Sequence, residues 1–122
     1  MENSVAVIKA CFHAYVQKDR AAIELLINDE FHFTSPLDNR IDRKLYFERC
    51  WPNSEHIDDF RFVHIVPFES KVVVVYEGKR SSGELFRNTE IFTVLQGKII
   101  EVEVYFGWTI PHKAPDNGFV AE

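Results

Sequence analysis

The chain has 122 residues, a length that fits one domain and leaves little room for a second. Its formal net charge is −5 and its Lys and Arg residues form no basic run, which argues against a nucleic-acid partner. Hydrophobic residues make up 46% of the chain, the level of a globular protein, and eleven Phe residues supply large rigid surfaces for a core or a cavity wall.

The chain ends and the cysteines carry no signal for export or for membrane insertion. The first residues lack the basic and apolar segments of a signal peptide, and no apolar run approaches the ~20 residues that span a bilayer. Cys11 and Cys50 do not have the spacing of a disulfide framework or of a metal site. We therefore expect two buried free thiols in a protein of the reducing cytoplasm, without a membrane partner.

Helical signals dominate the first part of the chain. Apolar residues recur at helical spacing over residues 3–17, which predicts an amphipathic helix. Asp19 is placed to cap a second helix, and Asp42 a third that Pro52 is expected to end. Between them, residues 31–35 predict a short strand, followed by a turn at Pro36-Leu37-Asp38-Asn39.

From Ile57 onward the hydrophobic period changes from that of a helix to that of a strand. Four strands are expected, with a tight turn at Gln96-Gly97 between the last two and a polar turn over residues 78–83. One face of the first strand is predicted to carry Phe60, Phe62, His64 and Val66. One face of the last is predicted to carry Ile100, Val102, Val104 and Phe106. Helices followed by strands indicate an α+β fold rather than alternating β/α units.

Four short segments carry a resemblance to a known family. They are Phe33-Thr34-Ser35-Pro36, Arg87-Asn88-Thr89-Glu90, Gly97-Lys98-Ile99-Ile100-Glu101-Val102 and Tyr105-Phe106-Gly107-Trp108. With the order of elements, they resemble the nuclear transport factor 2-like superfamily, and more narrowly its SnoaL-like and ketosteroid-isomerase-like members. The resemblance covers residues from about 3 to 108 and bears more on fold than on function, because one fold hosts many activities.

The resemblance implies a cone-shaped, strongly curved, mostly antiparallel sheet, covered by three N-terminal helices around an apolar pocket. Residues 1–108 would form this single domain. Residues 109–122 form a tail whose apolar side chains predict packing on the domain or on a partner subunit. The family also implies a homodimer through the outer sheet face, where Glu101, Glu103 and Tyr105 are expected.

Steroid isomerases of this family use an acid as the base, just before a Pro that follows the first strand. The matching position here is Ser35, and a hydroxyl group cannot shuttle a proton between carbons at neutral pH. Asp38 lies three residues further on, but the register does not favour an inward orientation. Steroid isomerisation itself is therefore not expected.

The same enzymes use a helix-one tyrosine and a protonated acid as oxyanion donors. Spacing places the tyrosine position near Cys11 or Phe12 rather than Tyr15, and places Glu90 at the position of the acid. Only one of the three catalytic positions is then chemically similar.

Glu90 and His64 are the proposed catalytic residues. Glu90 shares a strand face with Phe92 and Val94, and burial there would disfavour its charged form. His64 has an unperturbed pKa near neutrality and would form a dyad with Glu90 if the two strands are neighbours. The alternatives are a structural histidine, and an acid paired with a basic residue such as Arg87.

Further residues are expected to line the pocket, with plain core packing as the alternative for Trp51 and Phe106. The full set is Phe33, Ser35, Trp51, Phe62, Asn88, Phe92 and Phe106. An ion pair between Asp38 and Arg43 is expected to pin the turn before the third helix. The remaining histidines show no metal-binding spacing, and no nucleotide-binding motif is found, so neither a metal nor a cofactor is expected.

Two functions remain open from the sequence. One is a cofactor-free isomerase, cyclase or hydratase that acts on a small hydrophobic molecule. The other is a non-catalytic module that binds a hydrophobic ligand or a protein partner. An enclosed pocket would favour a small molecule, and an apolar patch outside the sheet would favour a partner.

Overall fold

The computed structural model describes residues 3–121 and contains three α-helices, one 3₁₀ helix and a six-stranded sheet. The helices are α1 (Ser4–Gln17), α2 (Arg20–Leu26), α3 (Arg43–Arg49) and the 3₁₀ helix η1 (Trp51–His56). The strands are β1 (Ile27–Ser35), β2 (Asp38–Asp42), β3 (Ile57–Phe68), β4 (Lys71–Arg80), β5 (Leu85–Leu95) and β6 (Lys98–Ile110).

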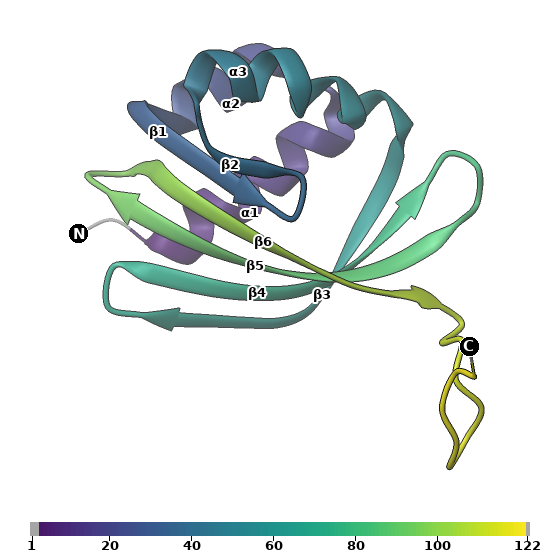
Figure 1. Ribbon diagram of the computed structural model, residues 1–122. Helices are drawn as coiled ribbons and strands as arrows, with labels where there is room; N and C mark the ends of the chain where they lie inside the picture. The colour runs from purple at the N-terminus through teal and green to yellow at the C-terminus, as the bar shows by residue number, and fades with distance from the viewer. Residues whose placement is uncertain (1–2, 122) are drawn as a thin grey trace.

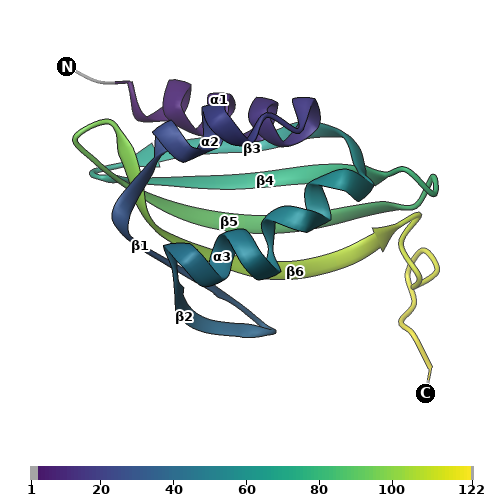
Figure 2. The same ribbon diagram turned by 90° about the horizontal axis from the view of Figure 1, so that it is seen from above.

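The strands form one open, curved sheet in the order β2-β1-β6-β5-β4-β3 (Figure 1). Only β1 and β6 run parallel, and the other neighbours are antiparallel. All three α-helices lie over the concave side of the sheet, as the view from above shows (Figure 2). The expected α+β cone with helices covering a curved sheet is confirmed.

A short polar side chain caps the start of each of the three α-helices. The Asn3 side chain accepts a hydrogen bond from the amide of Ala6 at the start of α1. Asp19 and Asp42 do the same at the starts of α2 and α3, at 3.1 and 2.9 Å, so both predicted caps are confirmed.

Three predicted boundaries are wrong. The expected turn over residues 36–39 is confined to Pro36 and Leu37, because Asp38 already pairs with Ser35 as the first residue of β2. Pro52 does not stop the third helix but lies at the start of η1, where its missing N–H costs nothing. β4 continues through Gly78 to Arg80, beyond the point where the polar turn was expected.

Two bulges change which side chains face the helices. In β3 the pairing slips between Phe62 and His64, so that Phe62 lies opposite Tyr76 whereas His64 lies opposite Val75. One extra residue turns every later side chain to the other face of a strand. The expectation that His64 shares a face with Phe62 is therefore wrong, and His64 is exposed on the outer face.

The second bulge lies in β6, where the pairing slips between Thr93 and Val94 of β5. Ile99 is consequently buried against the helices at 1% exposure, and Ile100 faces outward. The predicted inward position of Ile100 is wrong for the same reason as that of His64. Val102 and Val104 lie on the inner face as expected.

Beyond β6 the tail runs away from the body of the domain (Figures 1 and 2). Phe119 in this tail is 83% exposed in the single chain. Packing of the tail on a partner subunit stays a prediction. Among the helices of residues 3–121, none combines the length and the apolarity needed to cross a membrane.

Candidate functional site

A cavity of about 400 Å³ lies between the helices and the concave face of the sheet. Its wall is built mostly from aromatic and aliphatic side chains of α1 and of the strands. Phe12 of α1 is central, with its ring centroid 5.0 Å from those of both Phe60 and Tyr76 and 5.9 Å from that of Phe92. These edge-on contacts fix the shape of the wall and leave few polar groups facing the cavity.

The first polar group is a chain of hydrogen bonds that ends on Glu90. The hydroxyl group of Tyr76 donates to Glu90 Oε2 at 2.5 Å, and Asn88 Nδ2 approaches the same hydroxyl at 3.4 Å. Asn88 is held in turn by the amide of Gly107, which donates to its Oδ1 at 3.1 Å. Strands β4, β5 and β6 together therefore position one carboxyl group inside an apolar cavity.

Burial raises the pKa of Glu90 to about 7, and the hydrogen bond from Tyr76 opposes this by favouring the charged form. The side chain is only half-buried, because its carboxyl group faces the cavity rather than packed atoms. No basic side chain of residues 3–121 forms an ion pair with it, and Arg87 and Arg61, its alternative partners, bind Glu77 instead. Glu90 thus exchanges a proton near neutral pH.

The second polar group is a pair of tyrosines from α1 and α3. The hydroxyl groups of Tyr15 and Tyr46 lie 2.6 Å apart, and burial raises the pKa of both. One hydroxyl donates to the other, which leaves one O–H for a ligand. Tyr15 shares the inward side of α1 with Cys11 and Phe12 because residues 11, 12 and 15 lie on one helical face. Tyr15 therefore lines the cavity, although spacing placed the tyrosine position of the steroid isomerases near Cys11 or Phe12.

The third polar group lies in the turn between β1 and β2. Ser35 Oγ donates to Asp38 Oδ2 at 2.9 Å, and Arg49 pairs with Asp38 Oδ1 at 3.2 Å. Asp38 lines the cavity and its side chain is only 9% exposed. The two-residue turn places Asp38 opposite Ser35, and for this reason the expectation of an outward Asp38 is wrong.

The predicted pair between Asp38 and Arg43 is also wrong. Arg43 donates instead to the carbonyl oxygen of Glu24 at 3.0 Å and lies over the ring of Phe47. Arg49, six residues later at the end of α3, is the residue that reaches Asp38.

The structure brings together most, but not all, of the predicted site residues. Those in the cavity wall are Phe33, Ser35, Asn88, Glu90, Phe92 and Phe106. His64 lies on the outer face, so the proposed dyad with Glu90 is not formed. Phe62 packs on the ring of Phe12, and Trp51 packs behind Tyr15 with the ring centroids 4.9 Å apart, so neither lines the cavity.

Sequence reasoning did not find Tyr46 and Tyr76 as site residues. Tyr76 stands at an alternate position from Val74 and Val72, and this period-two pattern marks it as inward-facing. Tyr46 has no such signal, because α3 has only seven residues and little periodicity. A hydroxyl group at the end of an otherwise apolar row of inward-facing residues was the sequence signal that would have predicted Tyr76 as a site residue.

The thiols and the remaining acids offer no further chemistry at this site. Burial raises the pKa of Cys50 to about 12 and that of Cys11 even further, so both thiols stay protonated at neutral pH. Within residues 3–121, no cluster of three His, Cys, Asp or Glu side chains is arranged to hold a metal ion. A second hollow, open to solvent beside Phe47, is lined by equal numbers of acidic and basic side chains, so neither sign of charge predominates there.

Solved structures with the same architecture are numerous, although their sequences differ widely from this one. A protein of unknown function from Cytophaga hutchinsonii, described as NTF2-like, superimposes with a TM-score of 0.69 at 18% identity over 88% of this chain and 92% of its own. The chain has the nuclear transport factor 2-like fold. No family model matches the chain, and no curated protein matches it in sequence.

Two other proteins with this nuclear transport factor 2-like fold have names that refer to an activity. An LEH-like epoxide hydrolase from M. tuberculosis has a TM-score of 0.72 at 15% identity, over 85% of this chain and 82% of its own. IdmH from Streptomyces antibioticus, a candidate polyketide cyclase, has a TM-score of 0.66 at 18% identity, over 84% and 91%. At these identities the likeness establishes the fold alone.

Proposed function

We propose that the cavity binds a small, mostly apolar molecule and moves a proton on it, as a cofactor-free isomerase, cyclase or hydratase does. The observation that carries this proposal is Glu90, an acid with a pKa of about 7 in an apolar wall and without an ion-pair partner among residues 3–121. A general acid or base works best when its pKa lies near the operating pH.

The other polar groups of the cavity fit complementary roles. The Tyr15–Tyr46 pair offers a hydroxyl hydrogen that would bind a ligand oxygen on which negative charge develops. Asp38, paired with Arg49, offers a carboxyl group that would accept a proton or orient a water molecule. A carboxyl group therefore lies beside Ser35. The sequence argued against proton transfer between carbons because Ser35 stands where the isomerases have an acid, and the nearby Asp38 weakens that argument.

The names of structural neighbours support the same class of chemistry. An epoxide hydrolase and a candidate polyketide cyclase share the fold, and their names refer to reactions of small organic molecules. The aromatic wall of this chain would hold the carbon skeleton of such a molecule and exclude water from it.

The test starts with native mass spectrometry and a thermal-shift screen against steroids, polyketides, fatty acids and small aromatic acids. A ligand at 100 times its Kd stabilises the fold by about 2.7 kcal/mol, a clear shift for a domain of this size. With a turnover assay in hand, Glu90→Gln is expected to lower kcat by about 10²–10⁴-fold. If Glu90 acts as an acid, the rate of the natural chain falls as the pH rises through about 7.

Glu77→Gln is the matched control, because Glu77 lies on the opposite face of the sheet and does not line the cavity. The proposal fails if Glu90→Gln changes neither turnover nor ligand affinity.

We also propose that the outer face of the sheet binds a second copy of the chain, whether or not the cavity is catalytic. This face carries exposed apolar side chains, with Val66, Tyr105 and Trp108 each about half exposed. Exposed aromatic residues on an uncovered sheet face favour a protein interface. The family resemblance implied the same homodimer through the outer sheet face.

Sedimentation velocity over a range of concentrations tests this second proposal. The natural chain is expected to sediment as a dimer, and Tyr105→Lys, which places a charge in the centre of the face, is expected to shift it to a monomer. Leu25→Lys, on the exposed side of α2, is a control that should leave the dimer intact. A natural chain that is monomeric at every concentration contradicts the proposal.

A further inference from the structure

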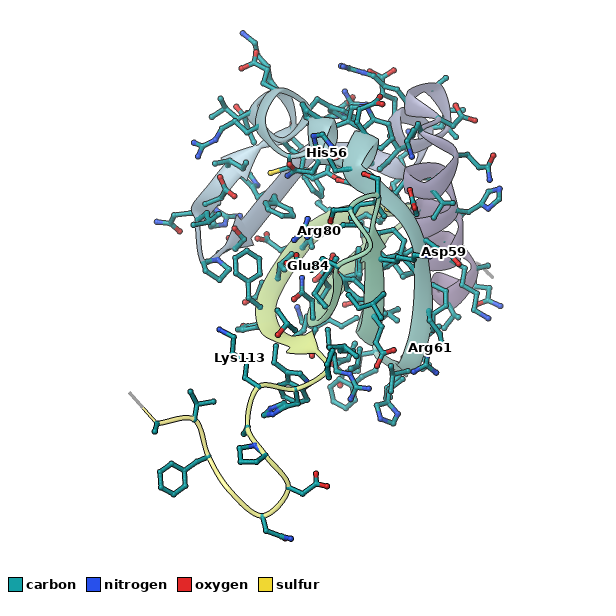
Figure 3. The ribbon with its side chains drawn as sticks, turned by 90° about the vertical axis from the view of Figure 1, so that its right-hand side faces the viewer. His56, Asp59, Arg61, Arg80, Glu84 and Lys113 are labelled. Atoms are coloured by element: carbon teal, nitrogen blue, oxygen red, sulfur yellow. The ribbon has the colours of Figure 1, made fainter. Side chains whose placement is uncertain are left out.

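The rim of the cavity carries a positive charge that the proposed proton chemistry does not use. Of the residues within 3–121 that line the cavity, Arg80 at the end of β4 is the only one with a basic side chain. Figure 3 shows it beside Glu84 on the hairpin between β4 and β5, below His56 of η1. The remaining described lining of the cavity consists mostly of phenyl rings, aliphatic side chains and hydroxyl groups, with the carboxyl groups of Glu90 and Asp38.

Arg80 is held in place by its surroundings. Its guanidinium carbon lies 4.6 Å from the ring centroid of Phe86, which is itself part of the cavity wall. That ring in turn lies over Gly78, where a Cβ would come within 2.3 Å of it. Because Gly78 has no side chain, the ring of Phe86 can pack directly over its backbone. The Arg80 guanidinium group lies over that ring in a cation–π contact.

The backbone of the hairpin is also tied down. The amide of Arg80 donates to the carbonyl oxygen of Glu84 at 2.9 Å, and the amide of Ser81 donates to that of His56 at 2.9 Å. The hairpin is therefore anchored to η1 rather than free to swing. Arg80 has a defined position at the rim even though 43% of its side chain is exposed.

Part of the guanidinium group remains free to bind a ligand. Nε donates to Glu84 Oε1 at 2.8 Å, whereas no acceptor within residues 3–121 lies at hydrogen-bonding distance from the two Nη atoms. Two parallel N–H groups on a planar guanidinium match the two oxygens of a carboxylate. Glu84 is 54% exposed, and ion pairs at the surface are weak. Its contact with Nε therefore leaves the two Nη atoms available to a ligand carboxylate.

A negatively charged ligand group has no other favourable place among the cavity-lining residues that the structure describes. The interior raises the pKa of Glu90, which shows that it disfavours a negative charge. Asp38, on the other lining turn, is already paired with Arg49 and Ser35 and repels an anion. An anionic group of a ligand would therefore lie at Arg80, with the apolar body of the molecule inside.

From this placement we infer that the molecule held by the cavity is an amphipathic organic acid, whose carboxylate binds Arg80 at the rim while its hydrocarbon body fills the aromatic interior. The inference rests on the proposed small-molecule function and narrows its substrate class. Arg80 is a specificity-determining residue in this arrangement, and it does not take part in the proton transfer at Glu90.

Isothermal titration calorimetry with matched pairs tests the inference, using 4-phenylbutyrate, 6-phenylhexanoate and decanoate against their methyl esters. At about pH 6 these acids are ionised, whereas Glu90 is still mostly protonated. The natural chain is expected to bind each acid at least about 10-fold more tightly than its ester. Arg80→Gln is expected to bring the ratio close to one, and Arg80→Lys to keep part of it, because the charge remains and the paired N–H groups are lost.

Arg61→Gln is the control, since Arg61 lies on β3 away from the cavity and should keep the full preference (Figure 3). Thermal unfolding of each variant verifies that it is folded. Esters that bind as tightly as acids, or a preference that survives in Arg80→Gln, would overturn this inference and leave the acid–base function standing. If neither acids nor esters bind, this inference is overturned, whereas the acid–base function is still decided by the effect of Glu90→Gln on turnover and ligand affinity.

Discussion

Glu90 on the inner face of the sheet and Glu77 on its outer face lie on neighbouring strands, yet their carboxyl groups behave in opposite ways. Glu77 accepts hydrogen bonds from Arg87 at 2.5 Å and from Arg61 at 2.8 Å, and these bonds lower its pKa. Glu90 accepts one hydrogen bond, from the neutral hydroxyl group of Tyr76, and burial raises its pKa to about 7.

The difference arises from a single step along β4. Tyr76 and Glu77 are consecutive residues and therefore point to opposite faces of the sheet. Tyr76 reaches the acid of the inner face, and Glu77 meets two arginines on the outer face. The inner face thus shifts the pKa of its acid toward neutrality, whereas the outer face holds its acid in ion pairs, so of these two glutamates only Glu90 exchanges a proton near neutral pH.

The largest effect that separates the two faces is expected from aromatic truncation. Phe92 on the inner face is 2% exposed, whereas Tyr105 on the outer face is 51% exposed. Phe92→Ala should lower the free energy of unfolding by about 3–5 kcal/mol, and Tyr105→Ala by less than about 0.5 kcal/mol in the monomer. Urea denaturation at low protein concentration measures both. Equal losses would show that the outer face is not the more weakly packed one.

An intermediate effect is expected from Glu90→Gln on the pH dependence of stability. Since the folded chain keeps the Glu90 proton up to about pH 7 while the unfolded chain releases it near 4.5, the folded state binds more protons in this window. Its stability therefore falls as the pH rises from 4.5 to 7, by about 3 kcal/mol at about 1.4 kcal/mol per pH unit.

Glu90→Gln should remove this loss, so the variant becomes more stable relative to the natural chain as the pH is raised. Urea unfolding of both proteins at several pH values gives the difference curve. A flat difference curve would mean that the natural Glu90 titrates at its ordinary pKa.

The smallest effect, of opposite sign, is expected from Glu77→Gln. Because the pKa of Glu77 is lowered in the fold, its charged form contributes stability above the unfolded pKa, and this contribution is lost as the pH falls through the folded pKa. The variant should therefore be less stable than the natural chain at neutral pH, with the gap closing in acid. The same unfolding series detects it, and a gap that widens in acid would contradict the assignment.

The local signals in the sequence were strong where one short segment decides its own conformation. Asp19 and Asp42 cap their helices because a carboxylate two or three residues before free backbone amides satisfies them directly. Gln96 and Gly97 form the turn between β5 and β6 with positive φ angles of 51° and 80°. The order of helices before strands was sufficient to predict the α+β class.

The faces of the strands could be predicted only up to the first bulge. Phe60 and Phe62 point inward as expected, but the slip after Phe62 moves His64 outward. A bulge is set by how two distant segments pair and twist, and alternation within one strand carries no sign of it. The catalytic hypothesis for His64 failed for this reason, whereas Glu90, in a stretch of β5 without a slip, lies where it was predicted.

The sequence by itself determined the fold class, the caps and the position of an acid on an apolar strand face, because these depend on periodicity and on contacts within a few residues. Only the tertiary structure decided which groups meet that acid and the cavity around it. Tyr15 meets Tyr46 across 31 positions, and Tyr76 meets Glu90 across 14. Such contacts depend on sheet register and helix placement, which are properties of the packed whole rather than of any one segment.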